Sequence, residues 1–174
     1  MKKLLVFIAF IAFLLAACPK AARAQDGFES VTGEEVTKAL PEHFEVEKTR
    51  VPVQKLNAVL LKNHKGARVI VGILDTSGVP PRIRQKYSAM LIAETKITLG
   101  SIPVDPGSYA FGLLPPKPPS KNATFMFYTK EGDELGECPA RRDPSITAPK
   151  SLGVIAPAGG PTKLTFFQYS VEVH

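Results

Sequence analysis

From Arg50 onward, apolar and polar residues alternate in short runs separated by Pro, Gly, Asn and Asp. Alternation of this kind is typical of β-strands, because successive side chains point to opposite faces of a sheet. Two such runs, 56–61 and 67–74, flank the turn-forming residues 63–66 and predict a hairpin. Both faces of the second run are apolar, so we expect a central strand that is covered on both sides.

Residues 82–99 alternate in the same way and are predicted to form a strand. Met90 and Ile92 interrupt its polar face, which indicates that another layer covers its centre. Further strands are expected at 108–114, 122–129, 151–156 and 163–173, with an irregular loop at 136–150. About seven short strands are typical of an antiparallel sandwich or a small barrel. We predict a mainly β fold, an antiparallel β-sandwich with one short N-terminal helix.

That helix is predicted between Thr32 and Pro41. Thr32 and Glu35 have the spacing of a capping box, and Val31 and Val36 are placed to form a hydrophobic staple. Pro41 ends the helix after about two turns. Its short apolar stripe predicts that it docks on the strands.

The N-terminus has the pattern of an export signal. Two lysines precede 14 consecutive apolar residues, a stretch too short to span a membrane as a stable helix. An A-x-A site places cleavage between Ala24 and Gln25, whereas L-A-A-C resembles a lipobox in which Cys18 is lipidated. We therefore expect a periplasmic or secreted protein that is not an integral membrane protein. An outer-membrane lipoprotein, held by a lipid anchor, is the alternative.

Removal of the signal changes the charge of the chain. The full sequence has 22 basic and 16 acidic side chains, a formal charge of +6; without residues 1–24 it has 18 and 16. Residues 25–49 hold seven acids and two lysines, whereas residues 50–174 hold 16 bases and nine acids. We predict a signal peptide over 1–24, an acidic helical leader over 25–49 and a β-sandwich domain over 50–174. The leader is expected to pack on the domain or, alternatively, to mask a basic binding face.

Catalytic chemistry is not indicated. The chain has no G-x-S-x-G, H-E-x-x-H, Walker A, G-x-G-x-x-G or CxxC motif, and its three histidines lack ligand spacing. We expect no metal, no cofactor and, since the exported chain lacks RNA-binding motifs, no nucleic acid. Cys138 is the only thiol left free after processing. Three roles stay open for it: a buried small hydrophobe, an intermolecular bridge or a nucleophile.

Arg82, Arg84 and Lys86 are the candidate binding residues, because alternate positions share one face of a strand. Such a cationic ridge suits a lipid surface, an acidic glycan or an envelope protein with an acidic surface. Charged side chains also protect an edge strand against unwanted pairing, which is the competing interpretation. A second candidate site is an apolar cavity among five aromatic rings, with a packed core as the alternative. These rings belong to Phe111, Phe125, Phe127, Phe166 and Phe167.

Residues 86–114 combine K-Y, an apolar strand, a short turn, P-G-x-Y and a second apolar strand. The stretch resembles the central hairpin of a family of small exported bacterial β-sandwich proteins of uncharacterised function. Similar P-G-x-Y turns occur in transthyretin-like and Ig-like modules. The resemblance covers about 30 of 174 residues and implies a secreted β-sandwich without a catalytic residue. Its matching positions are Lys86, Tyr87, Pro106, Gly107 and Tyr109.

Together these patterns predict an exported, non-catalytic binding or structural module of the bacterial cell envelope. Two alternatives stay open: a carrier that holds an apolar small molecule or lipid within the sandwich, and a hydrolase or thiol enzyme. The expected partner is an envelope protein, a glycan or a lipid surface.

Overall fold

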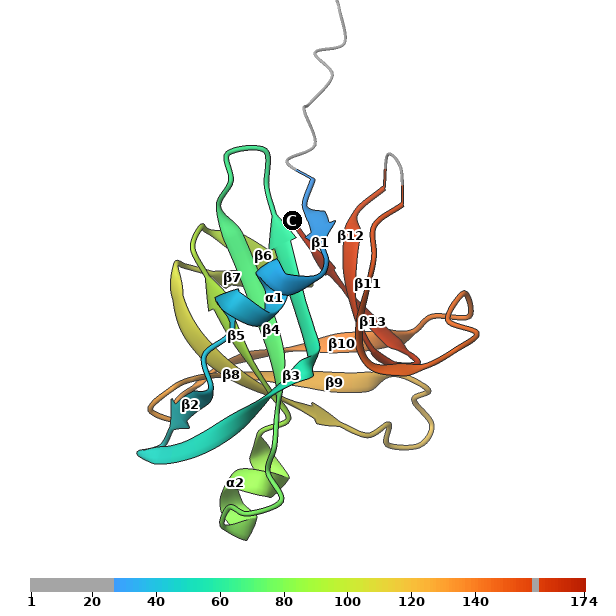
Figure 1. Cartoon of the computed structure of the whole chain (residues 1–174). Helices are drawn as coiled ribbons and strands as arrows, with labels where there is room; N and C mark the ends of the chain where they lie inside the picture. The colour runs from blue at the N-terminus through green and yellow to red at the C-terminus, as the bar shows by residue number, and fades with distance from the viewer. Residues whose placement is uncertain (1–26, 158–159) are drawn as a thin grey trace, which may run out of the picture.

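The computed structural model describes residues 27–157 and 160–174, so the predicted export signal with Cys18, Ala24 and Gln25 lies outside the described residues. The described part contains two short helices and thirteen strands (Figure 1). The helices are α1 (Glu34–Ala39) and α2 (Pro81–Lys86). The strands are β1 (Glu29–Val31), β2 (His43–Val46), β3 (Thr49–Lys62), β4 (Arg68–Leu74), β5 (Ala89–Ala93), β6 (Ile97–Leu99), β7 (Ile102–Val104), β8 (Gly107–Leu114), β9 (Ala123–Thr129), β10 (Glu134–Arg142), β11 (Lys150–Ile155), β12 (Thr162–Phe167) and β13 (Tyr169–Val173).

A single antiparallel sheet forms the body of the protein, in the strand order β1-β3-β4-β5-β8-β9-β10-β13-β12-β11. The sheet curls until it is nearly closed into a barrel, because the last strand in this order, β11, lies against β3 and β4. The Thr162 hydroxyl also donates a hydrogen bond of 2.9 Å to the carbonyl of Phe28, just before β1. Three short strands extend the sheet: β2 pairs with β3, and β6 pairs with β13 and β7.

The predicted β-sandwich is therefore wrong. A sandwich needs two separate sheets that face each other, whereas β10 carries this sheet onward without a break. Its residues 134–140 pair with β9, and Arg141 and Arg142 pair with β13. The segment predicted as an irregular loop, 136–150, contains most of β10, and the segment 163–173 is a hairpin of β12 and β13 rather than one strand.

Two predictions that concern the helices need correction. Residues 82–86 belong to α2, not to a strand, and Pro81 starts this helix in the first-turn position that favours proline. The alternating strand pattern begins only at β5. In α1 the capping box is absent, because Gly33 occupies the N-cap and no side chain caps the helix. The existence and the short length of α1 are as predicted.

Apolar side chains cover both faces of the central strands, as predicted for residues 67–74. One face of β4 and β5 contributes Val71 and Leu91 to the barrel interior. Ile70 and Met90 on the opposite face belong to a second apolar cluster, together with residues of α2, the β2–β3 hairpin and the end of α1. This second cluster is the additional layer that we predicted from the apolar residues Met90 and Ile92.

Candidate functional site

The structure separates the three cations that were predicted to form a ridge. On a helix, Arg82 and Lys86 lie one turn apart on the same side, whereas Arg84 lies on a different side. Arg82 and Lys86 both form ion pairs with Glu47, at 3.0 Å for the Lys86 Nζ. Within the described residues Arg84 has no ion pair. The cationic ridge therefore does not form, because most of its charge is neutralised within the protein.

Glu47 is the centre of a polar cluster that holds α2 against two turns. One is the β2–β3 turn, which contains Glu47, and the other is the β9–β10 turn, which contains Gly132. The Tyr87 hydroxyl donates to its carboxylate at 2.6 Å, and the Lys86 ammonium also donates to the Gly132 carbonyl at 2.8 Å. Lys86 lies 4.5 Å from the centre of the Tyr128 ring, a cation–π contact. The hydrogen bonds from Tyr87 and Lys86 lower the pKa of Glu47. Burial of the Tyr87 hydroxyl, with a smaller contribution from its hydrogen bond to Glu47, raises the pKa of Tyr87 to about 12.

These groups satisfy one another, so the Glu47 cluster is a structural clamp. A recess of about 430 Å³ lies beside it, lined by Glu47, Lys48, Lys130 and Glu131 among others. Its charges are mixed, and Lys130 pairs with Glu131 at 3.8 Å. We therefore do not place a ligand there.

The P-G-x-Y sequence also has a structural role. The Tyr109 hydroxyl donates to the carbonyl of Asp105 at 2.8 Å, so the side chain folds back over its own turn. A Cβ at Gly107 would lie 3.0 Å from the Tyr109 oxygen, so a larger residue there would press on the Tyr109 side chain. Both motifs of the resemblance, K-Y and P-G-x-Y, thus stabilise the local structure.

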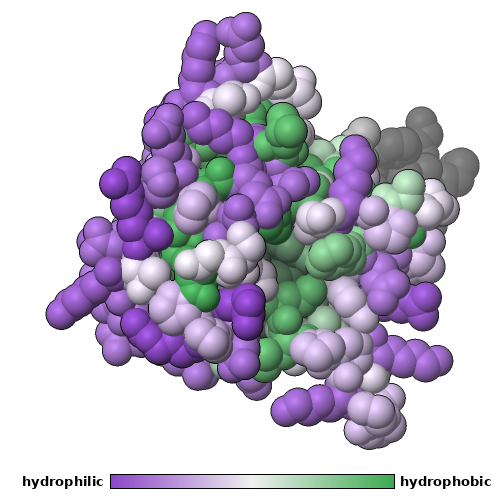
Figure 2. Space-filling model, turned by 60° about the horizontal axis from the view of Figure 1, so that its bottom comes forward, coloured by the Kyte–Doolittle hydropathy of each residue, from purple (hydrophilic) through white to green (hydrophobic). Residues whose placement is uncertain are grey.

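Four of the five aromatic residues proposed to line an apolar cavity pack against one another in the barrel interior. The ring centres of Phe111, Phe125 and Phe166 are 4.9–5.6 Å apart, and Phe127 lies 6.3 Å from Phe111. Phe167 is not among them, since it is 54% exposed on the outside. Apolar side chains do reach the surface in a hollow on the face shown in Figure 2. The ring contacts are those of a packed core.

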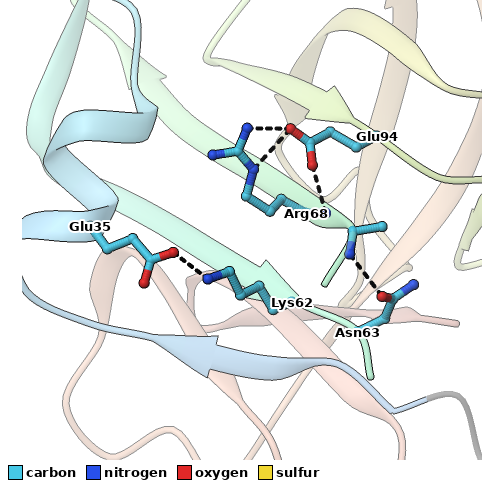
Figure 3. Close-up of polar contacts among 6 residues, drawn as sticks. Glu35, Lys62, Asn63, Arg68 and Glu94 are labelled. Atoms are coloured by element: carbon cyan, nitrogen blue, oxygen red, sulfur yellow. Dashed lines mark hydrogen bonds and ion pairs between the residues drawn. The ribbon is translucent and has the colours of Figure 1, made fainter. Parts of the chain in front are cut away.

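A cluster of charged side chains near the β3–β4 turn is also fully paired (Figure 3). Lys62 and Arg68 lie directly opposite each other in neighbouring strands, an arrangement that like charges disfavour. Glu35 of α1 pairs with Lys62, and Glu94 pairs with Arg68. Hydrogen bonds from Arg68 lower the pKa of Glu94. Together with the Glu47 pairs, these contacts show acids of residues 25–49 packing on bases of the body, as their charge predicted.

The larger recess, of about 470 Å³, opens between β10 and β13. The two strands pair only at Arg141 and Arg142 and separate toward Cys138. The β6–β7 turn spans the gap, where the Gly100 amide donates to the Glu172 carbonyl at 2.8 Å. Cys138, Arg141, Arg142, Asp143, Lys163 and Ser170 are among the residues that line the recess.

Cys138 contributes apolar surface to this recess. The residue is 2% exposed, and burial raises the pKa of its thiol, so the thiol is protonated at neutral pH. A protonated, buried thiol is a poor nucleophile and a poor partner for an intermolecular bridge. Of the three roles left open, the burial favours the small hydrophobe.

The anionic groups at the recess are largely satisfied. Asp143 accepts hydrogen bonds from the Ser145 hydroxyl at 2.6 Å, from the Lys163 ammonium at 3.2 Å and from the Ser170 hydroxyl at 3.3 Å. The hydrogen bonds from Ser145, with a smaller contribution from Lys163, lower the pKa of Asp143 to about 2. Asp143 is therefore ionised at neutral pH and neutralises Lys163. Glu172, a further lining residue, lies 3.4 Å from the His174 ring nitrogen.

Arg141 and Arg142 remain as two guanidinium groups without an ion pair among residues 27–157 and 160–174. A guanidinium group offers a planar set of donors that matches a carboxylate or a phosphate. Sequence reasoning missed this pair because it placed both arginines in an irregular loop. The two adjacent arginines could have been noticed in the sequence. The pairing of β10 with β13, which places them at the recess, could not be predicted from it.

Comparison with known proteins adds no identity: no family model, curated protein or solved structure matches the chain. The resemblance of residues 86–114 to small exported proteins stays a prediction. No helix in the described part is long and apolar enough to cross a membrane. The described residues also contain no group of His, Cys, Asp and Glu side chains arranged to hold a metal ion.

Proposed function

We propose that this protein is an exported, non-catalytic binding module of the bacterial cell envelope that binds an anionic group in the recess between β10 and β13. Export is inferred from the signal pattern of residues 1–24. The observation that supports anion binding is the pair Arg141 and Arg142, two exposed residues that line the recess and have no ion pair in the described structure.

The composition of the recess limits the ligand class. Its volume of about 470 Å³ falls within the usual range of small-molecule sites. Val171, Pro139 and the protonated thiol of Cys138 supply apolar surface, while the arginines supply donors. Glu172 opposes anion binding and limits the net positive charge. The site therefore suits a ligand with one phosphate or carboxylate group on a small, mostly uncharged body.

Binding of glycerol 3-phosphate and of inorganic phosphate to the purified mature protein tests the proposal, measured by isothermal titration calorimetry. Hydrogen bonds to charged groups contribute about 1.5–3 kcal/mol, so the Arg141→Gln/Arg142→Gln double variant should bind at least about tenfold more weakly. Arg84→Gln is the matched control, because it removes another exposed arginine without an ion pair from a different element.

Binding that is unchanged in the double variant would exclude the recess as the site. An intact protein that binds neither anion would overturn the proposed function. Thermal unfolding of each variant establishes that the fold is intact, as expected for exposed arginines.

A further inference from the structure

Phe167 projects from the turn between β12 and β13, next to the anion recess. Its ring is 54% exposed and its φ angle is +54°. Phe167 and Gln168 form the two-residue turn, since Phe166 pairs with Tyr169. A positive φ at the first position of such a turn is usually taken by glycine or asparagine, and a bulky residue there is strained.

Exposure and strain both disfavour phenylalanine at this position. The ring takes no part in the aromatic contacts of the barrel interior. Strained, exposed aromatic residues are often found at functional sites, where the cost is offset by a contact with a partner. The partner must therefore supply an environment that takes up an apolar ring.

The surroundings of Phe167 are cationic. Lys150 lies directly opposite Phe167 in the β11–β12 pair, and Arg141 and Arg142, the last residues of β10, pair with β13 beside the same turn. The backbone amide of Asp143 donates to the Gln168 carbonyl at 2.9 Å, which joins the loop after β10 to the turn (Figure 1). Lys150, Arg141 and Arg142 are exposed and have no ion pair in the described parts of the chain. The nearby Asp143 is already engaged by Lys163, Ser145 and Ser170.

We propose that this tip, made of Arg141, Arg142, Lys150 and Phe167, docks on the surface of a bilayer that contains anionic lipids. Phe167 enters the region of the lipid head groups, where aromatic rings are favoured. Lys150 and the two arginines attract the anionic surface, each by about fivefold in affinity. The inference rests on the proposed function, because it identifies the anionic group in the recess as the phosphate of a lipid head group.

Vesicle cosedimentation tests the inference. The protein is exported with a Cys18→Ser substitution, so that no acyl chain contributes to binding. We expect it to sediment with vesicles that contain phosphatidylglycerol and to stay in solution with vesicles of phosphatidylcholine alone. Added salt should weaken the binding, since surface attraction is screened.

Phe167→Gly is the deciding variant. It removes the ring and relieves the positive φ, so the protein should unfold at a higher temperature while its vesicle affinity falls at least about fivefold. Glycerol 3-phosphate binding should stay unchanged, because the arginines remain. The control is Leu56→Ser, which removes a 98% exposed leucine on β3 and should leave vesicle binding unaltered.

The outcomes separate the two proposals. Binding of free glycerol 3-phosphate without any vesicle binding would overturn the inference and leave the anion site standing. Vesicle binding that Phe167→Gly does not change would also overturn it. Failure to bind either probe would remove both proposals, and vesicle binding without free phosphate binding would overturn the recess as the anion site.

Discussion

Gly112 on β8 lies against the end of α2. A Cβ built on Gly112 would overlap the backbone carbonyl oxygen of Lys86. Because a backbone carbonyl cannot rotate away as a side chain does, Gly112→Ala should push α2 off the sheet and weaken the hydrogen bonds from Lys86 and Tyr87 to Glu47. We expect a loss of about 3 kcal/mol in the free energy of unfolding, measured by urea denaturation.

Gly78→Ala is the control for this prediction. A Cβ at Gly78 meets no atom within 4 Å, so alanine there should change stability by less than about 0.5 kcal/mol. Equal stability of the two variants would show that α2 does not need the close approach.

At the scale of elements, the β2–β3 hairpin turns through Glu47 and Lys48, which both have positive φ angles, +47° and +60°. Glu47 is held in this conformation by its side-chain partners, whereas Lys48 has no ion pair or side-chain hydrogen bond in the described residues. Lys48→Gly should therefore stabilise the protein by about 1 kcal/mol, because glycine adopts this conformation without strain. A shift of the urea midpoint to higher concentration is the expected observation.

Lys65 in the β3–β4 turn provides the comparison. It is exposed like Lys48 but is not among the residues with positive φ. Lys65→Gly should lower the stability by about 0.5–1 kcal/mol, because it only adds freedom to the unfolded chain. Stabilisation by both substitutions would argue against relief of strain at Lys48.

Elements with a complete periodic pattern were predicted well, and elements with mixed signals were not. The central strand at 67–74 was recognised because its apolar faces are uninterrupted. Residues 82–86 were predicted as part of a strand, although the preceding Pro81 occupies a position that favours the start of a helix, and these residues form most of α2. Gly136 and Pro139 are unusual inside a strand, so β10 was predicted as a loop. The β12–β13 turn contains none of the usual turn residues, so these two strands were predicted as one.

The candidate site was less predictable than the fold, for a related reason. Arg141, Lys150 and Phe167 come together only through the pairing of β10 with β13 and of β11 with β12. No local pattern specifies which distant strands pair. The sequence could identify the cations of residues 82–86, but not that Glu47 would neutralise two of them.

At the scale of the whole molecule, β13 joins the C-terminal strands to the rest of the sheet. In the strand order it lies between β10 and β12, and β11 pairs only with β12. Deletion of residues 169–174 should therefore detach β11 and β12 and expose the aromatic core. We expect loss of the cooperative urea transition, followed by circular dichroism, because the remaining interior cannot exclude water.

Deletion of His174 alone is the matched control. It leaves β13 in place and removes the two backbone hydrogen bonds with Thr98, at 2.7 and 3.0 Å, and the exposed contact of the His174 ring with Glu172 at 3.4 Å. A cooperative transition in the variant that lacks residues 169–174 would show that other contacts, such as those of β11 with β3 and β4, hold the C-terminal strands in place.

The position of β13 also determines when the sheet can form during synthesis. β11 and β12 precede β13 in the chain, but they join β10 only after β13 has emerged. Pairings between distant segments form slowly, because the intervening chain must be ordered first. For the proposed export, this topology would keep the chain open until late in synthesis, and the proposed anion site would form only after β13 has crossed the membrane.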